Sequence, residues 1–158
     1  MSKKISKILC AVDLSEYSRE VAEYACTLAK SLDASVVVMY SAPSLSQYVG
    51  FHVPPNTIEN FVGEIVTGAE KSMDAFLEEN FKGVKAEGRV LVGYASDEIL
   101  KKAREEECDM IVMGTHGRRG IDRLLFGSVA EKVVKNSPIP VLTIRPSGHY
   151  TGGAMYKD

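Results

Sequence analysis

A glycine-rich segment, MGTHGRRGIDRLLFGSV, carries the residues whose spacing most clearly predicts chemistry in this sequence. It lies between an apolar run that predicts a strand, 109–113, and a run that predicts a helix, 128–136. Glycines at such a junction let the backbone turn sharply and approach a ligand, while the helix offers unpaired N–H groups and the positive end of its dipole. Together these features suit a phosphate group, which would lie against Gly114, Gly117, Gly127 and Ser128.

A simpler interpretation of the same segment is the ordinary junction between a strand and a helix. Ser128 would then cap the helix, and Glu131 would complete a capping box. The segment is also locally basic, which would help it to hold a multiply charged triphosphate, although a solvated surface loop has the same composition. The basic residues are His116, Arg118, Arg119 and Arg123.

Asp13 is the second candidate for ligand binding, because it directly follows the apolar run 7–12. A carboxylate at the end of a strand can accept hydrogen bonds from ribose hydroxyls or from the first turn of the next helix, and the sequence leaves both roles open. No GxxxxGK(S/T) motif is present and no GxGxxG follows the first strand, so neither a P-loop nor a dinucleotide fingerprint is indicated. The remaining hypothesis for the ligand is a mononucleotide held mainly by backbone groups.

The composition is that of an ordinary globular domain, with 45% hydrophobic and 25% charged residues among 158. A formal net charge of −2 provides no general attraction to nucleic acid or to an anionic membrane. The N-terminus leads directly into a strand pattern without a signal-peptide core, which predicts a cytoplasmic protein. Widely spaced cysteines and histidines favour reduced, mostly buried thiols over a protein-bound metal: Cys10, Cys26, Cys108, His52, His116 and His149.

Apolar runs that predict strands alternate with amphipathic runs that predict helices. Strands separated by helices require right-handed crossover connections, and they therefore build a parallel sheet that is covered on both faces. Ligands of such sheets bind at the carboxyl ends of the strands. Strands are expected at 7–12, 35–41, 84–92, 109–113 and 140–145, and helices at 16–32, 57–81, 96–107 and 128–136.

Two segments fall outside this alternation. The loop 42–55 is longer than typical connections, so it is expected to fold back onto the following helix or to act as a lid or docking surface. Gly63 and Gly68 indicate a bend in that helix or an earlier start. A single domain is expected over 1–146, followed by a flexible C-terminal tail, 147–158. The apolar side chains of the loop are Tyr48, Val49, Phe51 and Val53.

Three motifs, in order, resemble the universal stress protein family: the opening KILCAVDLSEYS, the pattern G-x2-G-x9-G-(S/T) at 114–128, and the closing SPIPVLTIR. The resemblance covers 5–145 and is to the branch that binds ATP through the glycine pattern. It implies an open five-stranded parallel sheet of order 3-2-1-4-5 with helices on both faces, a Rossmann-like fold of the adenine nucleotide alpha hydrolase-like type. It also implies a homodimer through antiparallel pairing of the fifth strand, 141–145, which would otherwise be an exposed edge.

Carried over residue by residue, the resemblance implies an adenine pocket at the ends of the first two strands, formed by Ala11, Val12, Asp13 and Ser41. The phosphate site that it implies consists of Met113, Gly114, Gly117, Gly127, Ser128 and Val129, to which the basic loop adds Arg118. Family members often have proline at the position of Ala11 and histidine-valine at Tyr40-Ser41. Contacts to the base would therefore come from the main chain here.

The function expected from the resemblance is an ATP-binding regulatory switch in the stress response, at most a slow ATPase, with Mg or Mn bound through the phosphates. An unidentified regulatory protein would be its partner. The alternative is a dimeric interaction or adaptor module in which nucleotide is incidental. An adenylyl-transfer enzyme on the same fold lacks support, because Asp13-Leu14-Ser15 stands where a glycine-rich pyrophosphate loop would be expected.

Overall fold

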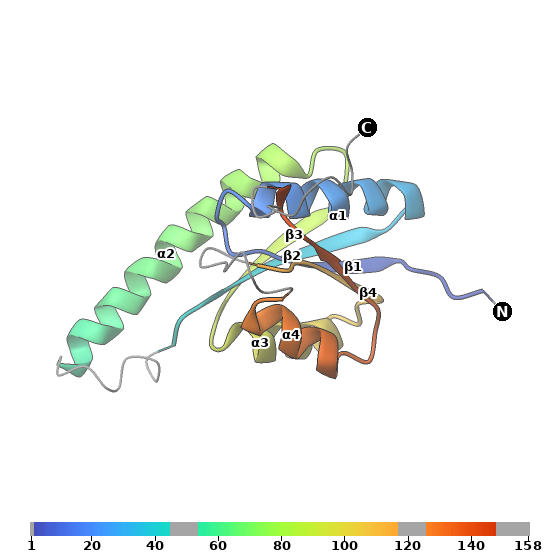
Figure 1. The fold of residues 1–158 in the computed structure, drawn as a ribbon. Helices are drawn as coiled ribbons and strands as arrows, with labels where there is room; N and C mark the ends of the chain where they lie inside the picture. Colours follow the sequence, from blue (N-terminus) through green and yellow to red (C-terminus); the bar gives the residue numbers. More distant parts are fainter. Residues whose placement is uncertain (1, 45–53, 117–125, 148–158) are drawn as a thin grey trace.

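The fold is a parallel sheet with two helices on each face (Figure 1). In this computed structural model, residues 2–44, 54–116 and 126–147 are described. The predicted tail therefore lies outside the described residues except for Ser147, as do positions 45–53 of the predicted loop. No helix in the described ranges has both the length and the apolar content needed to cross a bilayer.

The sheet confirms the predicted strand order, which is β3-β2-β1-β4-β5 with every neighbouring pair parallel. In the register, Cys10 on the central strand lies beside Val38 of β2 and Val112 of β4. The strands are β1 (Lys7–Ala11), β2 (Ser35–Ala42), β3 (Ala86–Val92), β4 (Met110–Gly114) and β5 (Val141–Ile144). The helices are α1 (Ser18–Leu32), α2 (Pro55–Asn80), α3 (Ala95–Glu105) and α4 (Ser128–Asn136).

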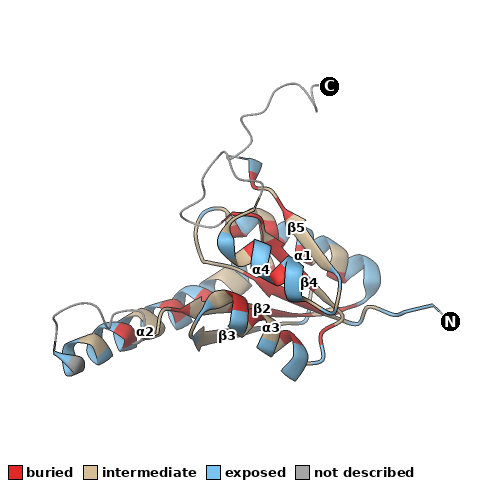
Figure 2. Ribbon diagram, turned by 60° about the horizontal axis from the view of Figure 1, so that its bottom comes forward, coloured by how far each residue is buried: buried red, intermediate tan, exposed pale blue. Residues whose placement is uncertain are grey.

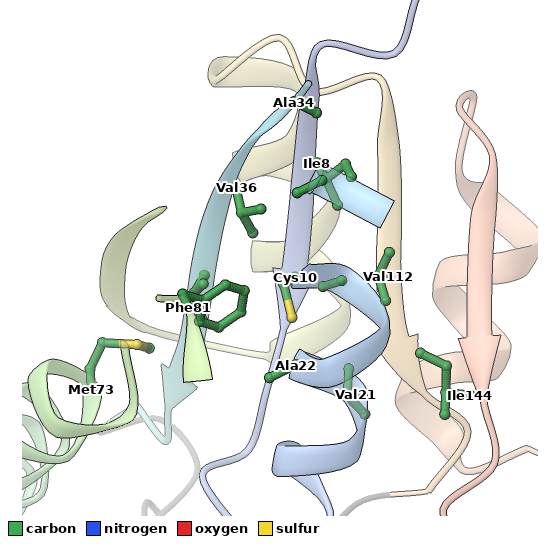
Figure 3. Close-up of a cluster of buried hydrophobic side chains, with 13 residues drawn as sticks. Ile8, Cys10, Val21, Ala22, Ala34, Val36, Met73, Phe81, Val112 and Ile144 are labelled. Carbon is green, nitrogen blue, oxygen red and sulfur yellow. The ribbon is translucent and has the colours of Figure 1, made fainter. Parts of the chain in front are cut away.

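Each face of the sheet carries its own hydrophobic core, because successive strand residues point to opposite faces. Ile8 and Cys10 pack beneath α1 and α2 (Figure 3), whereas Leu9 and Ala11 pack against α3 and α4. Figure 2 shows the resulting layers, in which the strands lie between helices whose outer faces are exposed; β1, β2 and β4 are the mostly buried strands. This two-sided burial explains why the strands read as continuous apolar runs.

Three of the departures from the predicted bounds lie next to residues whose backbone has a positive φ. Helix α1 begins two residues late, after a turn in which Leu14 has a φ of 60°. Helix α3 ends two residues early, before Glu107 with a φ of 54°, and β3 begins two residues late, after Gly83 with a φ of 79°. The left-handed region interrupts regular structure, and patterns of hydrophobicity do not report it.

Helix α2 is continuous and starts earlier than the predicted 57–81, with Pro55 in its first turn. The two glycines that indicated a bend, Gly63 and Gly68, do not interrupt it. The N-terminal part of α2 extends beyond the sheet (Figure 1). The early start is the alternative that the sequence left open.

The three cysteines are free thiols, and two of them are buried. Burial raises the pKa of the Cys10 thiol to about 12. Burial also dominates at Cys108 and raises its pKa to about 11. Both thiols therefore stay protonated at neutral pH and serve as packing groups, as the sequence predicted.

Asp109 ties the start of β1 to the start of β4. Its Oδ2 atom accepts hydrogen bonds from the main-chain N–H of Ser6 at 2.9 Å and of Lys7 at 3.1 Å. The hydrogen bond from the Ser6 backbone is the main cause that holds the pKa of Asp109 below its usual range. A carboxylate whose pKa is lower in the folded chain contributes stability above its unfolded pKa, and loses it as the pH falls through the folded value.

The substitution Asp109→Asn is therefore expected to reduce the free energy of unfolding by up to about 1 kcal/mol at pH 7, because solvent screens this half-buried group. The difference from the unmodified protein should shrink as the pH falls below about 3.9 and through the lower folded pKa. Urea denaturation of both proteins at pH 7 and at pH 3 measures the difference in the free energy of unfolding at each pH. An equal difference at the two pH values would contradict this linkage.

Candidate functional site

The candidate site lies where the order of the strands reverses direction. From the central strand β1 the chain proceeds first to β2 and β3 on one side, and later to β4 and β5 on the other. At this reversal, a cavity of about 140 Å³ opens at the carboxyl ends of β1 and β4. Crevices at such switch points are the usual ligand sites of open parallel sheets.

The ends of the two strands form the floor of the cavity. Strand β1 and the residues after it contribute Ala11, Val12 and Asp13, and the end of β4 contributes Met113 and Gly114. These residues are about a hundred positions apart in the sequence, but the parallel pairing of Ala11 with Met113 places them side by side. With Val129 of α4, six of the residues that the resemblance implied meet at one cavity.

Three helices complete the walls, and most of their contributions were not identified from the sequence. Because crossover helices begin at the carboxyl edge of the sheet, their first turns face the cavity. Ile99 is 3% exposed and packs on one face of the sheet, whereas Val21, also 3% exposed, packs on the other. The added lining residues are Tyr17, Ser18 and Val21 near the start of α1, and Ala95 and Ile99 of α3.

The described glycines of the motif lie where the backbone of neighbouring segments approaches closely. A Cβ atom at Gly127 would lie 3.2 Å from the carbonyl oxygen of Thr115, and one at Gly114 would lie 3.2 Å from that of His116. The main-chain N–H of Gly127 donates a hydrogen bond of 2.7 Å to Thr115. The start of α4 is thereby held against the end of β4, with no side chain between them. Gly117 lies outside the described residues.

The capping box of the simpler interpretation is absent at α4, because the helix is capped by Gly127 and Ser128 is its first residue. The carbonyl of Gly127 accepts the N–H of Glu131 at 3.0 Å, and no side chain caps the helix. Ser128 is exposed. The first turn therefore keeps the positive end of its dipole for an anion.

His116 is part of the cavity wall and does not lie on a solvated loop. It is 4% exposed, and its Nδ1 atom lies 3.0 Å from the hydroxyl of Thr115, which is also buried. The sequence treated His116 only as one member of a basic segment. The other basic residues of that segment, Arg118, Arg119 and Arg123, lie outside the described residues.

Ser41 does not line the cavity, although the resemblance implies a place in the adenine pocket. Strand β2 continues beyond the end of β1, and there Ser41 pairs with Leu91 of β3. Its hydroxyl donates a hydrogen bond of 2.9 Å to the carbonyl of Gly93. The side chain therefore supports the junction between β2 and β3.

The carboxylate of Asp13 binds the turn that follows it. Its Oδ1 atom accepts the main-chain N–H of Ser15 at 3.0 Å and the hydroxyls of Ser15 and Ser18 at 2.6 and 2.8 Å. This is the second of the two roles that the sequence left open, and it keeps Asp13 at the edge of the cavity. Within the described ranges there is no group of three or more His, Cys, Asp or Glu that could hold a metal ion.

Comparison with known proteins identifies relatives along nearly the whole chain. Universal stress protein MJ0531 of Methanocaldococcus jannaschii is 37% identical over 141 residues, which cover 88% of this chain and 81% of the relative. The solved structure of MJ0577, another universal stress protein of that organism, has a TM-score of 0.80 at 26% identity and covers 90% of this chain and 97% of its own.

A universal stress protein from Archaeoglobus fulgidus, solved in complex with dAMP, shares the fold. Its TM-score is 0.64 at 24% identity, with 90% of this chain and 100% of that chain covered. The model of the universal stress protein family matches residues 4–145. On this match and on the identity with MJ0531, the chain belongs to the universal stress protein family.

Proposed function

We propose that this chain binds an adenine nucleotide, ATP above all, at the cavity between β1 and β4 and acts as a nucleotide-dependent regulatory switch. The observation that carries the proposal is the cavity at the carboxyl ends of β1 and β4, which adjoins the first turn of α4 at Val129. The dAMP complex of the Archaeoglobus fulgidus relative supports an adenine nucleotide as the ligand class.

The chemistry of the cavity residues indicates which part of the nucleotide each of them would contact. Ala11, Val12 and Met113 present apolar surface and main-chain groups suited to the base, and Asp13 can accept hydrogen bonds from ribose hydroxyls. The main-chain N–H groups of Ser128 and Val129 begin α4 and would receive the phosphates, whereas the N–H of Gly127 already donates to the carbonyl of Thr115. Mg or Mn bound through the phosphates would add positive charge there.

The cavity is smaller than the sites of drug-sized ligands, which measure about 300 to 1000 Å³. Its volume of about 140 Å³ suits one part of a nucleotide, and the phosphates would then extend along the start of α4. Apolar residues such as Ile99 and Val21 line the space on both sides of the sheet edge. Burial of the base there would supply affinity without a charged partner.

Hydrolysis at this site is expected to be slow or absent. Fast phosphoryl transfer needs a positioned metal, a group that orients the nucleophile and groups that stabilise charge. Among the described lining residues, the carboxylate of Asp13 accepts three hydrogen bonds from its own turn, and His116 is buried beside Thr115. A turnover of about 1 to 1000 per second, the usual range of enzymes, would contradict this expectation.

A cytoplasmic homodimer that pairs through β5 is the expected assembly. Strand β5 is an edge of the sheet, paired only with β4 among the described strands. Its side chains meet both cores, since Ile144 is 7% exposed beneath α1 and Val141 packs on the side of α3 and α4. Such an ordered edge can accept a second strand. Sedimentation equilibrium that yields only the monomer mass of 17.3 kDa would contradict it.

Two measurements on the purified full chain test the proposed ligand. Denaturation followed by mass spectrometry should release an adenosine polyphosphate if the nucleotide is retained during purification. If no nucleotide is retained, ATP at about 100 times its dissociation constant should stabilise the fold by about 2.7 kcal/mol. The absence of both the released nucleotide and any stabilisation at millimolar ATP would overturn the proposal.

A further inference from the structure

A second cavity lies between the ends of α3 and α4, on the face of the sheet that these two helices cover (Figure 1). Its volume of about 470 Å³ falls within the usual range of small-molecule sites, about 300 to 1000 Å³. Crossover helices run back from the carboxyl edge of the sheet, so their ends lie at the amino edge. Among the described residues, this cavity and the candidate nucleotide cavity share no lining residue. The second cavity is therefore a separate site.

The inner wall of the second cavity is apolar. Ile111 of β4 is fully buried, and Ala103 and Cys108 are 5% and 6% exposed. Leu100 and Ile139 are partly buried, and they pack on the same core from α3 and from the turn before β5. Because these side chains carry no charge at neutral pH, the wall can cover an apolar group of a ligand and remove it from water.

Two side chains of opposite charge, Arg104 and Glu107, also line this cavity, and both are exposed. The main-chain N–H of Glu107 donates a hydrogen bond of 3.1 Å to the carbonyl of Arg104, so the turn after α3 keeps the two residues close together. Within the described ranges, neither side chain forms an ion pair, with the other or with any third residue. A ligand that carries both charges can therefore pair with both of them.

The ends of the two helices favour the same charge distribution. Helix α3 ends at Glu105 and α4 ends at Asn136, and the negative ends of both helix dipoles lie beside the cavity. A cationic group is favoured there, next to the carboxylate of Glu107. The guanidinium of Arg104 has the planar donors that bind a carboxylate through two hydrogen bonds.

We propose that this second cavity binds a free α-amino acid with a large apolar side chain. Its carboxylate would pair with Arg104, its ammonium group with Glu107, and its side chain would lie on the wall formed by Ile111, Leu100 and Ile139. The inference does not rest on the proposed nucleotide function, because it uses different residues at the other edge of the sheet.

Isothermal titration of the full chain with L-leucine tests the inference, and saturable binding at millimolar or lower concentration is expected. Glycine has the same two charges without the apolar side chain, so it should bind at least about tenfold more weakly. Leucinamide lacks the carboxylate, and N-acetyl-leucine lacks the ammonium group. Each should bind about fivefold more weakly than leucine, since one partly solvated ion pair is lost.

Two variants connect each charge of the amino acid to one residue. Arg104→Gln should weaken leucine about fivefold but leave leucinamide unchanged, because leucinamide has no carboxylate for Arg104 to bind. By the same argument, Glu107→Gln should weaken leucine and leave N-acetyl-leucine unchanged. Lys101→Gln is the matched control, since Lys101 is exposed on α3 and does not line the cavity. All three side chains are exposed, so the variants are expected to fold.

Several results would overturn the inference. No saturable binding of leucine at millimolar concentration would exclude the site, and equal affinities for leucine and glycine would exclude the apolar wall as the side-chain subsite. A variant of Arg104 that binds leucine as the unmodified protein does would exclude its pairing with the carboxylate. A titration with ATP is independent of all these results, so loss of either site leaves the other standing.

Discussion

Gly127→Val is expected to remove the stabilisation of this protein by ATP. At ATP about 100 times above its dissociation constant, that stabilisation corresponds to an upward shift in Tm of about 5 to 10 °C. A Cβ at this position would lie 3.2 Å from the Thr115 carbonyl oxygen, and valine adds two methyl groups. The start of α4 would move from the end of β4, and its N–H groups would be covered. Differential scanning fluorimetry with and without ATP measures the shift.

Gly63→Val is the matched control for this substitution. Gly63 lies within α2, and a Cβ there would meet no atom within 4 Å. The control should therefore keep the full shift with ATP, whatever its own Tm. Since Gly127→Val is also expected to lower the Tm without ligand, the comparison is between the shifts. A full shift in Gly127→Val would exclude the junction of β4 and α4 as the phosphate site.

Leu9→Ala is expected to have the largest effect on stability, a loss of about 2 to 5 kcal/mol in the free energy of unfolding. Leu9 is fully buried on the central strand β1, which has neighbouring strands on both sides. It packs with Val37 and Ile111 in the core beneath α3 and α4. Such a site cannot collapse to fill the space left by the removed atoms, so the full cost of a cavity is expected.

Leu32→Ala makes the same chemical change at the end of α1, where the side chain is 37% exposed. Its cost should stay below about 1 kcal/mol. Urea denaturation with an unchanged m value compares the two variants directly. Equal losses would show that burial on the central strand does not govern the stability of this fold.

Some features of the candidate site follow from local sequence rules, whereas others depend on tertiary contacts. The spacing of the glycines located the junction of β4 and α4, because close backbone approach demands small residues wherever it occurs. In the simpler interpretation the rule for helix caps pointed to Ser128, but the carbonyl of Gly127 accepts the N–H of Glu131, and Gly127 is the cap. The N–H of Gly127 donates to the carbonyl of Thr115, a contact between separate segments that no local pattern reports.

The apolar lining of the cavity was the part least accessible from the sequence. Ser18 and Ile99 each look like ordinary residues of an amphipathic helix, and their place at the cavity depends on how α1 and α3 pack. His116 was grouped with exposed basic residues, but the structure buries it beside Thr115. The sequence gives the charge type of a residue such as His116, whereas its burial depends on which helices and strands pack around it.

By itself, the sequence determined the alternation of strands and helices, the parallel sheet and, through the motifs that it shares with a family, the strand order. Those features follow from periodicity and from motifs that lie within single stretches of chain. Only the tertiary structure decided that the N–H of Gly127 donates to Thr115, that Ser41 supports β3, and that Asp13 is held by Ser18. These features depend on packing between elements, where the distance between atoms and not their order along the chain sets the interaction.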